Sequence, residues 1–539
     1  MEPLPGPTSS DDVSSAIEPD GVAILTEPYQ GAQRSRIFRN GALNLIGQGV
    51  VLLVNLFASR FLFTHLGSDA FGIVMFSLLL NTVVVSALEL GVSTTVVREV
   101  AASYDTDRSY AVSVIRFAGL VYWMAAVVIA GSIFLLAPVL VGRWIHLGTM
   151  SVNEASTVLR IIAIGAAFTL PRTLYSSLFR GRQRMEFNNI IDPATAITQQ
   201  AGLALVLWFH ADIVGVSFWL AISSCFAAVA YYLAATRMFG WRSLLPGYSA
   251  MALRHNRRFA LHMFAVTVLS TVHTQSDKLI VSKFMSVSDF GLYAFAAGLP
   301  ARAGVVTTAI SQASFPSLAE LFRNNARSRM MQQYRKIEET VNFGTLPMFA
   351  AVAFAALPIF ARVFNNQVGA MLVAPTVLLC VGWYMNSALS VPYMLSVAMG
   401  KPELTVRTNT VGIFVLLPLT VALVYEFGLV GAGLSWIAYH IFAYVYFVRM
   451  VCTECLNTSP WRWYLGVAKA FGLGAVAYGG PALVVSAGNP YDPVGSAVGF
   501  GVGTVLYLAG SYVLIGPEMR LVIRSIPSRV AFASALHAR

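Results

Sequence analysis

Residues 112–138 read VSVIRFAGLVYWMAAVVIAGSIFLLAP, with Arg116 as their one charged residue. A helix crosses the hydrocarbon core of a membrane with about 20 predominantly apolar residues, so this stretch is long enough to span. The rest of the chain shares this character, because 57% of its 539 residues are hydrophobic and 11% are charged. Soluble proteins carry about 25% charged residues. The composition excludes a soluble, fibrous or disordered chain and predicts an all-α polytopic membrane protein.

Similar apolar runs recur along the sequence and give about fourteen predicted transmembrane helices. They are 42–64, 70–92, 112–138, 156–178, 190–209, 213–236, 259–282, 290–315, 341–361, 370–394, 410–425, 430–448, 464–486 and 495–516. With the N-terminus in the cytoplasm, the inside segments hold 26 Lys and Arg residues and the outside loops hold 3. Cytoplasmic loops of membrane proteins are enriched in these residues. The bias predicts cytoplasmic N- and C-termini, and it explains the net charge of +11 without nucleic acid.

The loops divide the predicted helices into groups. The predicted parts are a disordered cytoplasmic tail (1–40), an N-lobe with spans 1–6 (41–236), a cytoplasmic linker (237–258), a C-lobe with spans 7–12 (259–450), spans 13–14 (451–516) and a cytoplasmic C-terminal tail (517–539). The first tail is too polar to bury a core and lacks the pattern of a cleaved signal peptide. The longest outside loop, 139–155, is too short for a domain with its own active site.

An internal repeat relates the two lobes. Phe71-Gly72 and Phe290-Gly291 are 219 residues apart, and so are Gly181 and Gly400. A third pair, Gly215 and Gly431, is 216 residues apart. All three pairs fall in equivalent loops, and both copies begin on the same side of the membrane. The pattern predicts two parallel six-helix repeats plus two extra C-terminal helices, an organisation typical of transporters with a site between two halves.

Two predicted spans carry polar stripes at helical spacing. Span 1 presents Asn44, Gln48, Asn55 and Ser59 within about 60° of one another, at about 100° per residue. Its repeat partner, span 7, presents His262, Ser270, His273 and Asp277. Each stripe is either one wall of a hydrated cavity or a set of helix–helix hydrogen bonds.

Charged residues inside a membrane are costly and mark candidate functional sites. The deep cations are Arg60, Arg172, Lys278 and Arg302, and the deep acids are Glu89 and Asp277. The excess is positive, which suits an anionic cargo. Asp277 and Lys278 are adjacent and are expected to diverge around the helix. Glu89, which either binds protons or pairs with Arg98, joins Asp277 and His273 as candidates for proton coupling.

No recognised catalytic or metal-binding pattern occurs in the sequence. It has no P-loop, no HExxH and no GxSxG. Cys452 and Cys455 form a single CTEC without the second pair that a structural zinc site needs. We therefore expect no cofactor, no metal and no enzymatic activity.

Six segments in a fixed order resemble the Wzx-type polysaccharide-biosynthesis flippases of the multidrug/oligosaccharidyl-lipid/polysaccharide exporter (MOP) superfamily. They are LGSDAFGIV (66–74), LELGVSTTVVRE (88–99), LFRGRQRMEFNN (178–189), ISQASFPSLAEL (310–321), GKPELTVRTN (400–409) and FGLVGAGLSW (427–436). The likeness covers about residues 40–516. It implies two lobes around a central cavity and transfer of an undecaprenyl-pyrophosphate-linked oligosaccharide across the bacterial inner membrane. The product would be O-antigen, capsule or exopolysaccharide.

In this hypothesis the protein transports by alternating access. The pyrophosphate is bound by Arg60, Arg172, Lys278 and Arg302, and the sugars contact Asn55 and Gln48. The partners are the lipid-linked oligosaccharide, membrane lipids and a polysaccharide polymerase or export protein. Three alternatives stay open: a drug or cation antiporter, a lipid II flippase, and a membrane enzyme acting on polyprenyl-linked sugars. The enzyme would need an acid or His in an outer loop, so Asp69 and Asp289 are the first control positions.

Overall fold

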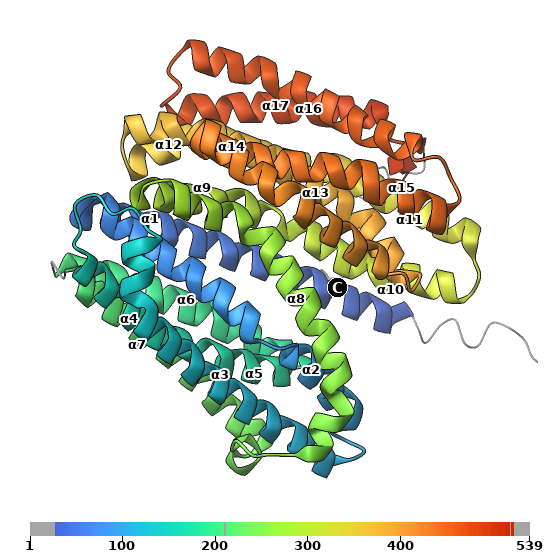
Figure 1. The fold of residues 1–539 in the computed structure, drawn as a ribbon. Coiled ribbons are helices and arrows are strands. Elements are labelled where there is room, and N and C mark those ends of the chain that lie inside the picture. The colour runs from blue at the N-terminus through green and yellow to red at the C-terminus, as the bar shows by residue number, and fades with distance from the viewer. Residues whose placement is uncertain (1–26, 210–211, 518, 522–539) are drawn as a thin grey trace, which may run out of the picture. The chain divides into compact units, whose positions relative to one another are not determined.

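The computed structural model describes residues 27–209, 212–517 and 519–521, with backbone alone before residue 53. Residues 1–53 and 54–539 form two separate units. In the first unit the described backbone is helical from Glu27, which includes residues 27–40 of the predicted disordered tail. The second unit is a bundle of long helices (Figure 1). In the described ranges it contains no strand, only an isolated bridge between His146 and Ser286. The prediction of an all-α membrane protein is therefore confirmed.

The first half of the chain supplies seven helices in the described residues. They are α1 (Glu27–Leu88), α2 (Val92–Ser103), α3 (Arg108–Arg143), α4 (Val152–Ala167), α5 (Thr169–Gly181), α6 (Met185–Trp208) and α7 (Ile213–Phe239). Helices α3 to α7 pack against one another, and α2 packs on α5 and α3. Asp107 caps α3, because its carboxylate accepts hydrogen bonds from the backbone N–H of Tyr110 (3.0 Å) and the hydroxyl of Ser109 (2.8 Å). These bonds lower the pKa of the Asp107 carboxyl.

The second half begins with α8, and its helices pack mainly with one another (Figure 1). The described helices are α8 (Ala250–Phe284), α9 (Val287–Ala303), α10 (Val305–Arg323), α11 (Arg327–Gly344), α12 (Leu346–Val363), α13 (Asn366–Ala398), α14 (Glu403–Ala443), α15 (Arg449–Val451), α16 (Trp461–Ala487) and α17 (Pro493–Leu514). Helix α13 contacts α9, α10, α12 and α14, and α8 lies along α14. Helix α8 starts inside the predicted linker 237–258, so the non-helical connection is shorter than expected.

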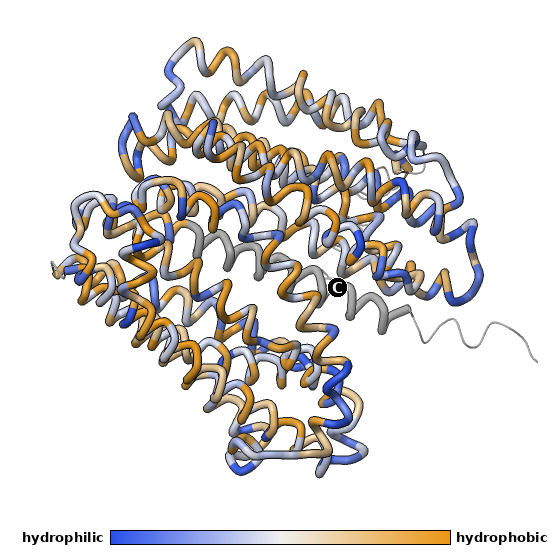
Figure 2. The backbone as a smooth tube through the Cα atoms, viewed as in Figure 1, coloured by the Kyte–Doolittle hydropathy of each residue, from blue (hydrophilic) through white to orange (hydrophobic). Residues whose placement is uncertain are grey.

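Ten helical segments among the described residues are long and apolar enough to cross a membrane. Two of them contain a kink where the sequence predicts a loop between two spans. Helix α1 bends at Gly67 (φ 85°), between predicted spans 1 and 2, and α14 bends at Gly428 (φ 56°), between spans 11 and 12. Figure 2 shows the apolar character along the helices and the polar residues at their ends. The chain is a multi-pass membrane protein, and the count of fourteen spans stays a prediction.

The repeat predicted from the sequence has a direct counterpart in the packing. Gly72 on α1 and Gly291 on α9, which are repeat partners, lie against each other. A Cβ atom on Gly291 would stand 2.6 Å from the Cα of Gly72, and one on Gly72 would stand 2.0 Å from the carbonyl oxygen of Val287. Only residues without a side chain allow this approach. Equivalent points of the two copies therefore meet, as expected near an axis that relates the two halves.

Candidate transport site

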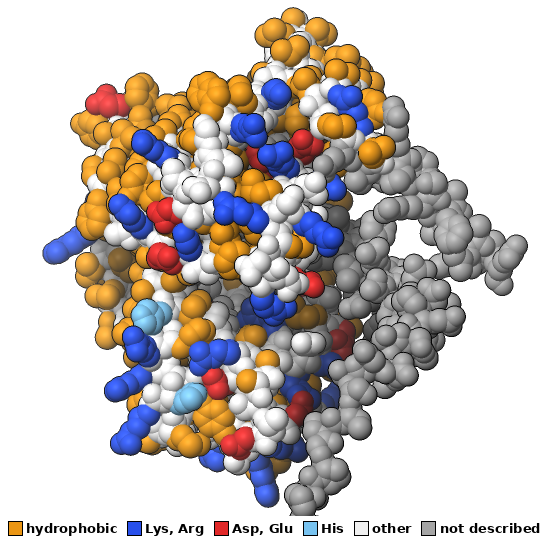
Figure 3. All heavy atoms as spheres, turned by 90° about the vertical axis from the view of Figure 1, so that its right-hand side faces the viewer, with side chains coloured by type: hydrophobic (Ala, Val, Ile, Leu, Met, Phe, Trp, Pro, Cys, Tyr) orange, Lys and Arg blue, Asp and Glu red, His pale blue; other side chains and the backbone are white. Residues whose placement is uncertain are grey.

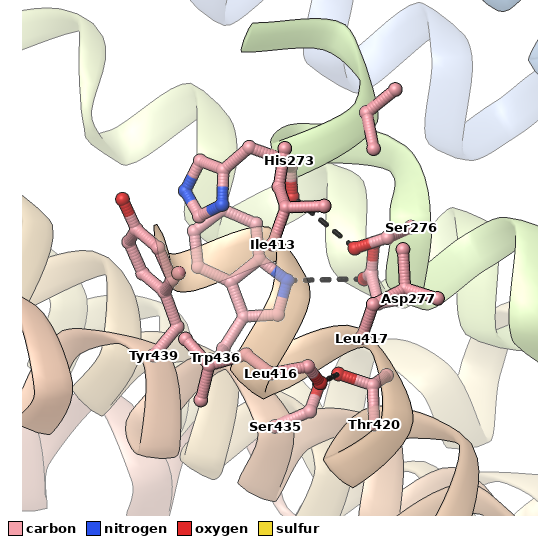
Figure 4. Close-up of a pocket in the computed structure, with 12 residues that line it drawn as sticks. His273, Ser276, Asp277, Ile413, Leu416, Leu417, Thr420, Ser435, Trp436 and Tyr439 are labelled. Atoms are coloured by element: carbon pink, nitrogen blue, oxygen red, sulfur yellow. Dashed lines mark hydrogen bonds between the residues drawn. The ribbon is translucent and has the colours of Figure 1, made fainter. Parts of the chain in front are cut away.

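The polar stripe of α8 ends at a buried carboxylate, Asp277, which is 2% exposed. Its Oδ2 accepts hydrogen bonds from the hydroxyl of Tyr293 on α9 (2.7 Å) and from the indole Nε1–H of Trp436 on α14 (3.1 Å). Figure 4 shows the indole directed at the carboxylate. A buried charge is tolerated only when it is paired and hydrogen-bonded, so these donors hold Asp277 inside the C-lobe. They also tie α8 to the two neighbouring helices.

Lys278 supplies the opposite charge. Its Nζ lies 3.6 Å from Oδ1 of Asp277 and donates to the carbonyl oxygen of Thr274 at 3.2 Å. The expectation that Asp277 and Lys278 diverge around the helix is therefore wrong. The lysine has four methylene groups, and the side chain turns back along α8 until the ammonium reaches the carboxylate. The charge of Lys278 is thereby partly compensated.

A cavity of about 30 Å³ lies beside Asp277 and is lined by residues of α8 and α14. His273, Ser276 and Asp277 line it together with Trp436 and Tyr439 (Figure 4). This volume accommodates about one water molecule. An organic cation or a sugar would not fit, whereas a proton or a water-sized ion would. The sequence predictions for Asp277 and His273 thus fall in one small polar chamber within a lobe.

His273 faces aromatic side chains in this chamber. Its ring centroid lies 3.7 Å from that of Tyr439 and 5.9 Å from that of Trp436. The Tyr439 hydroxyl donates to the Oδ1 of Asn409 at 2.7 Å. Trp436 also stacks on Trp383 of α13 (5.1 Å). The aromatic rings form the apolar wall, and Asp277 forms the polar end.

Tyr293 and Trp436 are the functional candidates that sequence reasoning missed. Each follows a repeat landmark, because Tyr293 comes two residues after Gly291 and Trp436 five residues after Gly431. Tyrosine and tryptophan are common in membrane helices, so residue type alone does not distinguish these two. Their partnership with Asp277 depends on the packing of three separate helices, of which α14 is distant in the sequence.

Arg172 on α5 has an acidic partner that the sequence analysis did not consider. Its Nη2 donates to Oδ1 of Asp192 on α6 at 2.6 Å, and its guanidinium lies 5.7 Å from the ring centroid of Tyr231. Asp192 therefore joins Glu89 and Asp277 among the acids inside the predicted spans. The internal charge excess is smaller than the sequence count suggests, and Arg172 is already paired.

Arg60 on α1 and Arg302 on α9 differ from Arg172 and Lys278. Both side chains are exposed, and neither forms an ion pair with an acid among the described side chains. Asn55, one turn before Arg60, is half-buried. Gln48, the other predicted sugar contact, lies in the part of α1 whose side chains fall outside the described residues. Among the four candidate cations, Arg60 and Arg302 are thus the two whose charge no acid among the described side chains compensates.

Glu89 lies in the turn between α1 and α2 and is half-buried. Its carboxylate is close to the hydroxyl of Ser93 and to the guanidinium of Arg180. Arg180 donates to the Ser93 hydroxyl at 2.9 Å and so joins α5 to α2. Arg98, the alternative partner, binds Glu99 at 2.6 Å instead. Glu89 therefore belongs to a contact between α2 and α5, separate from the chamber at Asp277.

The two lobes meet tightly at the end where α9 begins. Around the Gly72–Gly291 contact, Phe71 of α1 packs against Phe295 of α9 (6.0 Å) and Phe364 (5.5 Å). On the same side the backbone N–H of Val287 donates to the carbonyl oxygen of His146 at 2.9 Å. The charge bias assigns this end to the outside. The lobes are thus in close contact at the predicted outer end.

Asp69 is part of this closed end. Its Oδ2 accepts from the backbone N–H groups of Gly148 (2.9 Å) and Thr149 (2.5 Å), which holds the loop between α3 and α4. Asp289 accepts from the Ser286 hydroxyl at 2.8 Å in the first turn of α9. Both outer-loop acids therefore have structural contacts, and neither is a neutral control. Glu154, exposed in the first turn of α4, is a better one.

An apolar cavity of about 450 Å³ lies between α12, α13 and α16. Phe349, Phe354 and Phe471 line it with Tyr384 and Tyr478. Its surface is predominantly hydrocarbon, so it suits a lipid chain rather than a sugar or a phosphate.

The family model for polysaccharide biosynthesis proteins matches residues 62–373, more than half of the chain. The chain belongs to this family. The match includes α2 to α12 and therefore all of α8, on which Asp277 lies. It confirms the recognition that rested on six sequence segments, and it places the protein in the polysaccharide-biosynthesis branch of the MOP superfamily.

A protein of Shigella flexneri named "Putative O-antigen transporter" is 20% identical to this family member over 422 residues. That alignment covers 74% of the chain and 94% of the relative. The fold is that of MOP transporters. It matches the lipid II flippase MurJ in an inward closed conformation, with a TM-score of 0.67, 14% identity, and coverage of 88% of this chain and 98% of that chain.

The fold of this chain also matches that of an inward-facing multidrug resistance MATE family transporter of the MOP superfamily. The TM-score is 0.59 at 14% identity, covering 76% of this chain and 96% of the other. At such identity the two solved structures establish the fold alone. The relatives are transporters and flippases, which confirms the prediction of a membrane transporter rather than an enzyme.

Proposed function

We propose that this protein flips an undecaprenyl-pyrophosphate-linked oligosaccharide across the bacterial inner membrane for polysaccharide synthesis. The observation that carries the proposal is the family match together with two exposed arginines, Arg60 and Arg302, which have no described acidic partner. A pyrophosphate carries several negative charges and can cross hydrocarbon only when cations compensate them. Arg172 and Lys278, which are paired in this state, would contribute only after their acids separate from them.

We infer the orientation of the protein in the membrane from the distribution of its basic residues. Figure 3 shows Lys and Arg side chains gathered over the end of the bundle that faces the viewer there. The inside loops of the predicted topology hold 26 of the 36 basic residues. We assign this end to the cytoplasm. The close contact of Gly72 with Gly291 then lies on the periplasmic side, so the cargo would enter from the cytoplasmic side of this state.

Asp277, Glu89 and His273 stay candidates for coupling proton movement to the conformational change. The chamber at Asp277 supports a small coupling ion, because its volume of about 30 Å³ excludes larger ligands. Protonation of Asp277 would weaken its pairing with Lys278 and its hold on Tyr293 and Trp436. Because these bonds join α8 to α9 and α14, the change would alter packing inside the C-lobe. In this state the chamber is too small for an organic cation, which drug antiport at this carboxylate would require.

The test replaces the unpaired arginines in cells that carry only the variant gene. Arg302→Ala and Arg60→Ala should each reduce surface polysaccharide at least tenfold, while Arg302→Lys and Arg60→Lys retain most of it. Arg160→Ala is the matched control, because Arg160 is a half-buried arginine at a predicted span end, over the ring of Phe134 (4.9 Å). Glu154→Gln controls for an outer-loop acid. Wild-type polymer levels in the two alanine variants, or loss only in Glu154→Gln, would contradict the proposal.

A further inference from the structure

A second polar pocket, separate from the chamber at Asp277, opens between α2, α3 and the start of α8. Its volume is about 920 Å³, and it is open to the surface. It lies where α2 ends at Ser103 and α8 begins at Ala250. The predicted cytoplasmic linker 237–258, which includes the start of α8, carries Arg237, Arg242, Arg254, Arg257 and Arg258. The pocket therefore occupies the position of a membrane–water interface.

The pocket is lined by basic side chains on two facing helices. Arg98 comes from α2, and His255, Arg258 and His262 come from α8. The α8 residues are spaced three and four apart, so they share one face of the helix. Glu99 is the one acid among the lining residues, and it is 6% exposed and bound to Arg98. Arg258 has no acid partner among the described side chains.

Arg98 is held in one orientation by its neighbours. Its Nε and Nη2 donate to Oε1 of Glu99 (2.8 and 2.6 Å), and Nη2 also donates to Oδ1 of Asn256 (2.8 Å). The guanidinium lies 3.9 Å from the ring centroid of Phe259. Asn256 in turn donates from Nδ2 to the hydroxyl of Tyr110 (3.1 Å), so α2, α3 and α8 all contribute.

This support leaves part of Arg98 available to a ligand. The side chain is 41% exposed, and none of the hydrogen bonds among described residues uses its Nη1. A guanidinium that is fixed before binding loses little freedom when it binds an anion. Arg258 and the two histidines can complete the coordination from the opposite wall. An ordinary solvated surface charge would not need support from the buried Asn256 and the half-buried Tyr110.

We propose that this pocket binds a phosphate-bearing headgroup at the membrane surface. Arginines prefer phosphate because the planar donors match its oxygens. The volume is large enough for a headgroup around the phosphate, and Phe259 and Met251 add an apolar border. The inference goes beyond the proposed flippase activity and does not depend on the cargo. The phosphate would come either from an anionic lipid or from a soluble phosphate compound.

The test uses the full-length protein in phosphatidylcholine nanodiscs with two probes. One probe is phosphatidylglycerol mixed into the disc, with its retention measured by native mass spectrometry. The other is inorganic pyrophosphate, with its binding measured by calorimetry. The variant is Arg258→Ala, whose side chain is exposed, so folding is expected to be preserved. The matched control is Arg257→Ala, an exposed arginine on the same helix turn that does not line the pocket.

Arg258→Ala should weaken binding about tenfold, the size expected for the loss of one charge-assisted hydrogen bond. Arg257→Ala should bind like the wild type. Selective retention of phosphatidylglycerol would identify a lipid headgroup, and Arg258-dependent binding of pyrophosphate without lipid preference would identify a soluble phosphate. Absence of binding to both probes, or equal losses in the two variants, would overturn the proposal. Because binding is measured without translocation, this outcome is independent of the flippase test.

Discussion

The two repeats share a frame but differ in what they bury at equivalent positions. In the C-lobe, Asp277, Tyr293 and Trp436 form a hydrogen-bonded group across α8, α9 and α14. At the repeat offsets of 219 and 216 residues, the corresponding positions in the N-lobe are Ala58, Val74 and Leu220. These three side chains are also buried, with exposures of 2%, 3% and 8%. The helix framework therefore does not require the polar group.

The difference between the two lobes shows which part of the C-lobe packing needs and which part it does not. A buried ion pair is often no more stabilising than apolar side chains of similar volume, because desolvation offsets the attraction between the charges. The N-lobe shows an apolar solution at the matching place. We therefore interpret the Asp277 group as the part of the repeat that serves transport, and the glycine contacts and small residues as the part that serves folding.

The largest expected effect follows from removing the carboxylate. Asp277→Ala leaves the ammonium of Lys278 and the donors of Tyr293 and Trp436 without their acceptor. We expect a loss of about 3–5 kcal/mol in the free energy of unfolding in detergent, together with loss of transport. Asp277→Asn keeps an acceptor and should fold, but it should transport at least tenfold more slowly. Wild-type transport by Asp277→Asn would show that the charge is dispensable.

An acid placed in the N-lobe at the position equivalent to Asp277 tests whether that lobe can tolerate a buried carboxylate. Ala58→Asp puts a carboxylate where the repeat-equivalent donors are replaced by Val74 and Leu220. We expect destabilisation by about 3 kcal/mol, because the charge is buried without a partner. Ala58→Ser adds a hydroxyl that can donate to the helix backbone and serves as the control. Equal unfolding midpoints for the two variants would mean that the N-lobe position is wetter than its burial indicates.

The glycine contact between the lobes gives a smaller effect on stability and a clearer one on conformation. Gly72→Ala would place a Cβ 2.0 Å from the carbonyl oxygen of Val287. Overpacking of this kind costs about 1–3 kcal/mol, so the closed outer end should open more often. Spin labels beside the kink of α1 at Gly67 and at the start of α9 would report longer distances. Gly298→Ala on α9 is the matched control, because its Cβ would meet nothing within 4 Å. Unchanged distances in Gly72→Ala would contradict the packing described.

The smallest expected effect concerns one hydrogen bond of the Asp277 group. Tyr293→Phe removes the hydroxyl that donates to Asp277 at 2.7 Å and keeps the ring. A hydrogen bond to a charged group contributes about 1.5–3 kcal/mol, and Trp436 remains as a second donor, so we expect about 1.5 kcal/mol. Thermal unfolding in detergent would measure it. If Tyr293→Phe were as damaging as Asp277→Ala, the tyrosine would have a role beyond this bond.

Much of the fold was predictable because a membrane imposes a simple rule on composition and length. The apolar runs located the helices, and the short gaps at 65–69 and 426–429 correspond to the kinks at Gly67 and Gly428. The repeat offset anticipated that Gly72 and Gly291 are equivalent, although not that they touch. The spacing of apolar and polar residues describes one helix at a time, so it cannot predict contacts between helices.

The site was less predictable for the same reason. Sequence reasoning selected Lys278 by depth and charge, and Asp277 and His273 as part of the polar stripe of span 7; in the structure Asp277 is buried. It missed Tyr293 and Trp436, whose relation to Asp277 exists only after three helices pack. It listed Arg172 among the deep cations without identifying its partner, because Asp192 lies 20 residues away on the next helix. Depth along the chain identifies charged residues, but their neighbours decide which charges remain available.

The central claim is that Arg60 and Arg302 carry a pyrophosphate-linked cargo through the membrane. The most direct measurement reconstitutes the protein in proteoliposomes with a fluorescent polyprenyl-pyrophosphate-linked sugar and follows its transfer between leaflets. The wild type and Arg160→Ala should move the lipid at the same rate, and Arg60→Ala combined with Arg302→Ala should move it at the rate of protein-free liposomes. Transfer at the wild-type rate by the double variant would contradict the account.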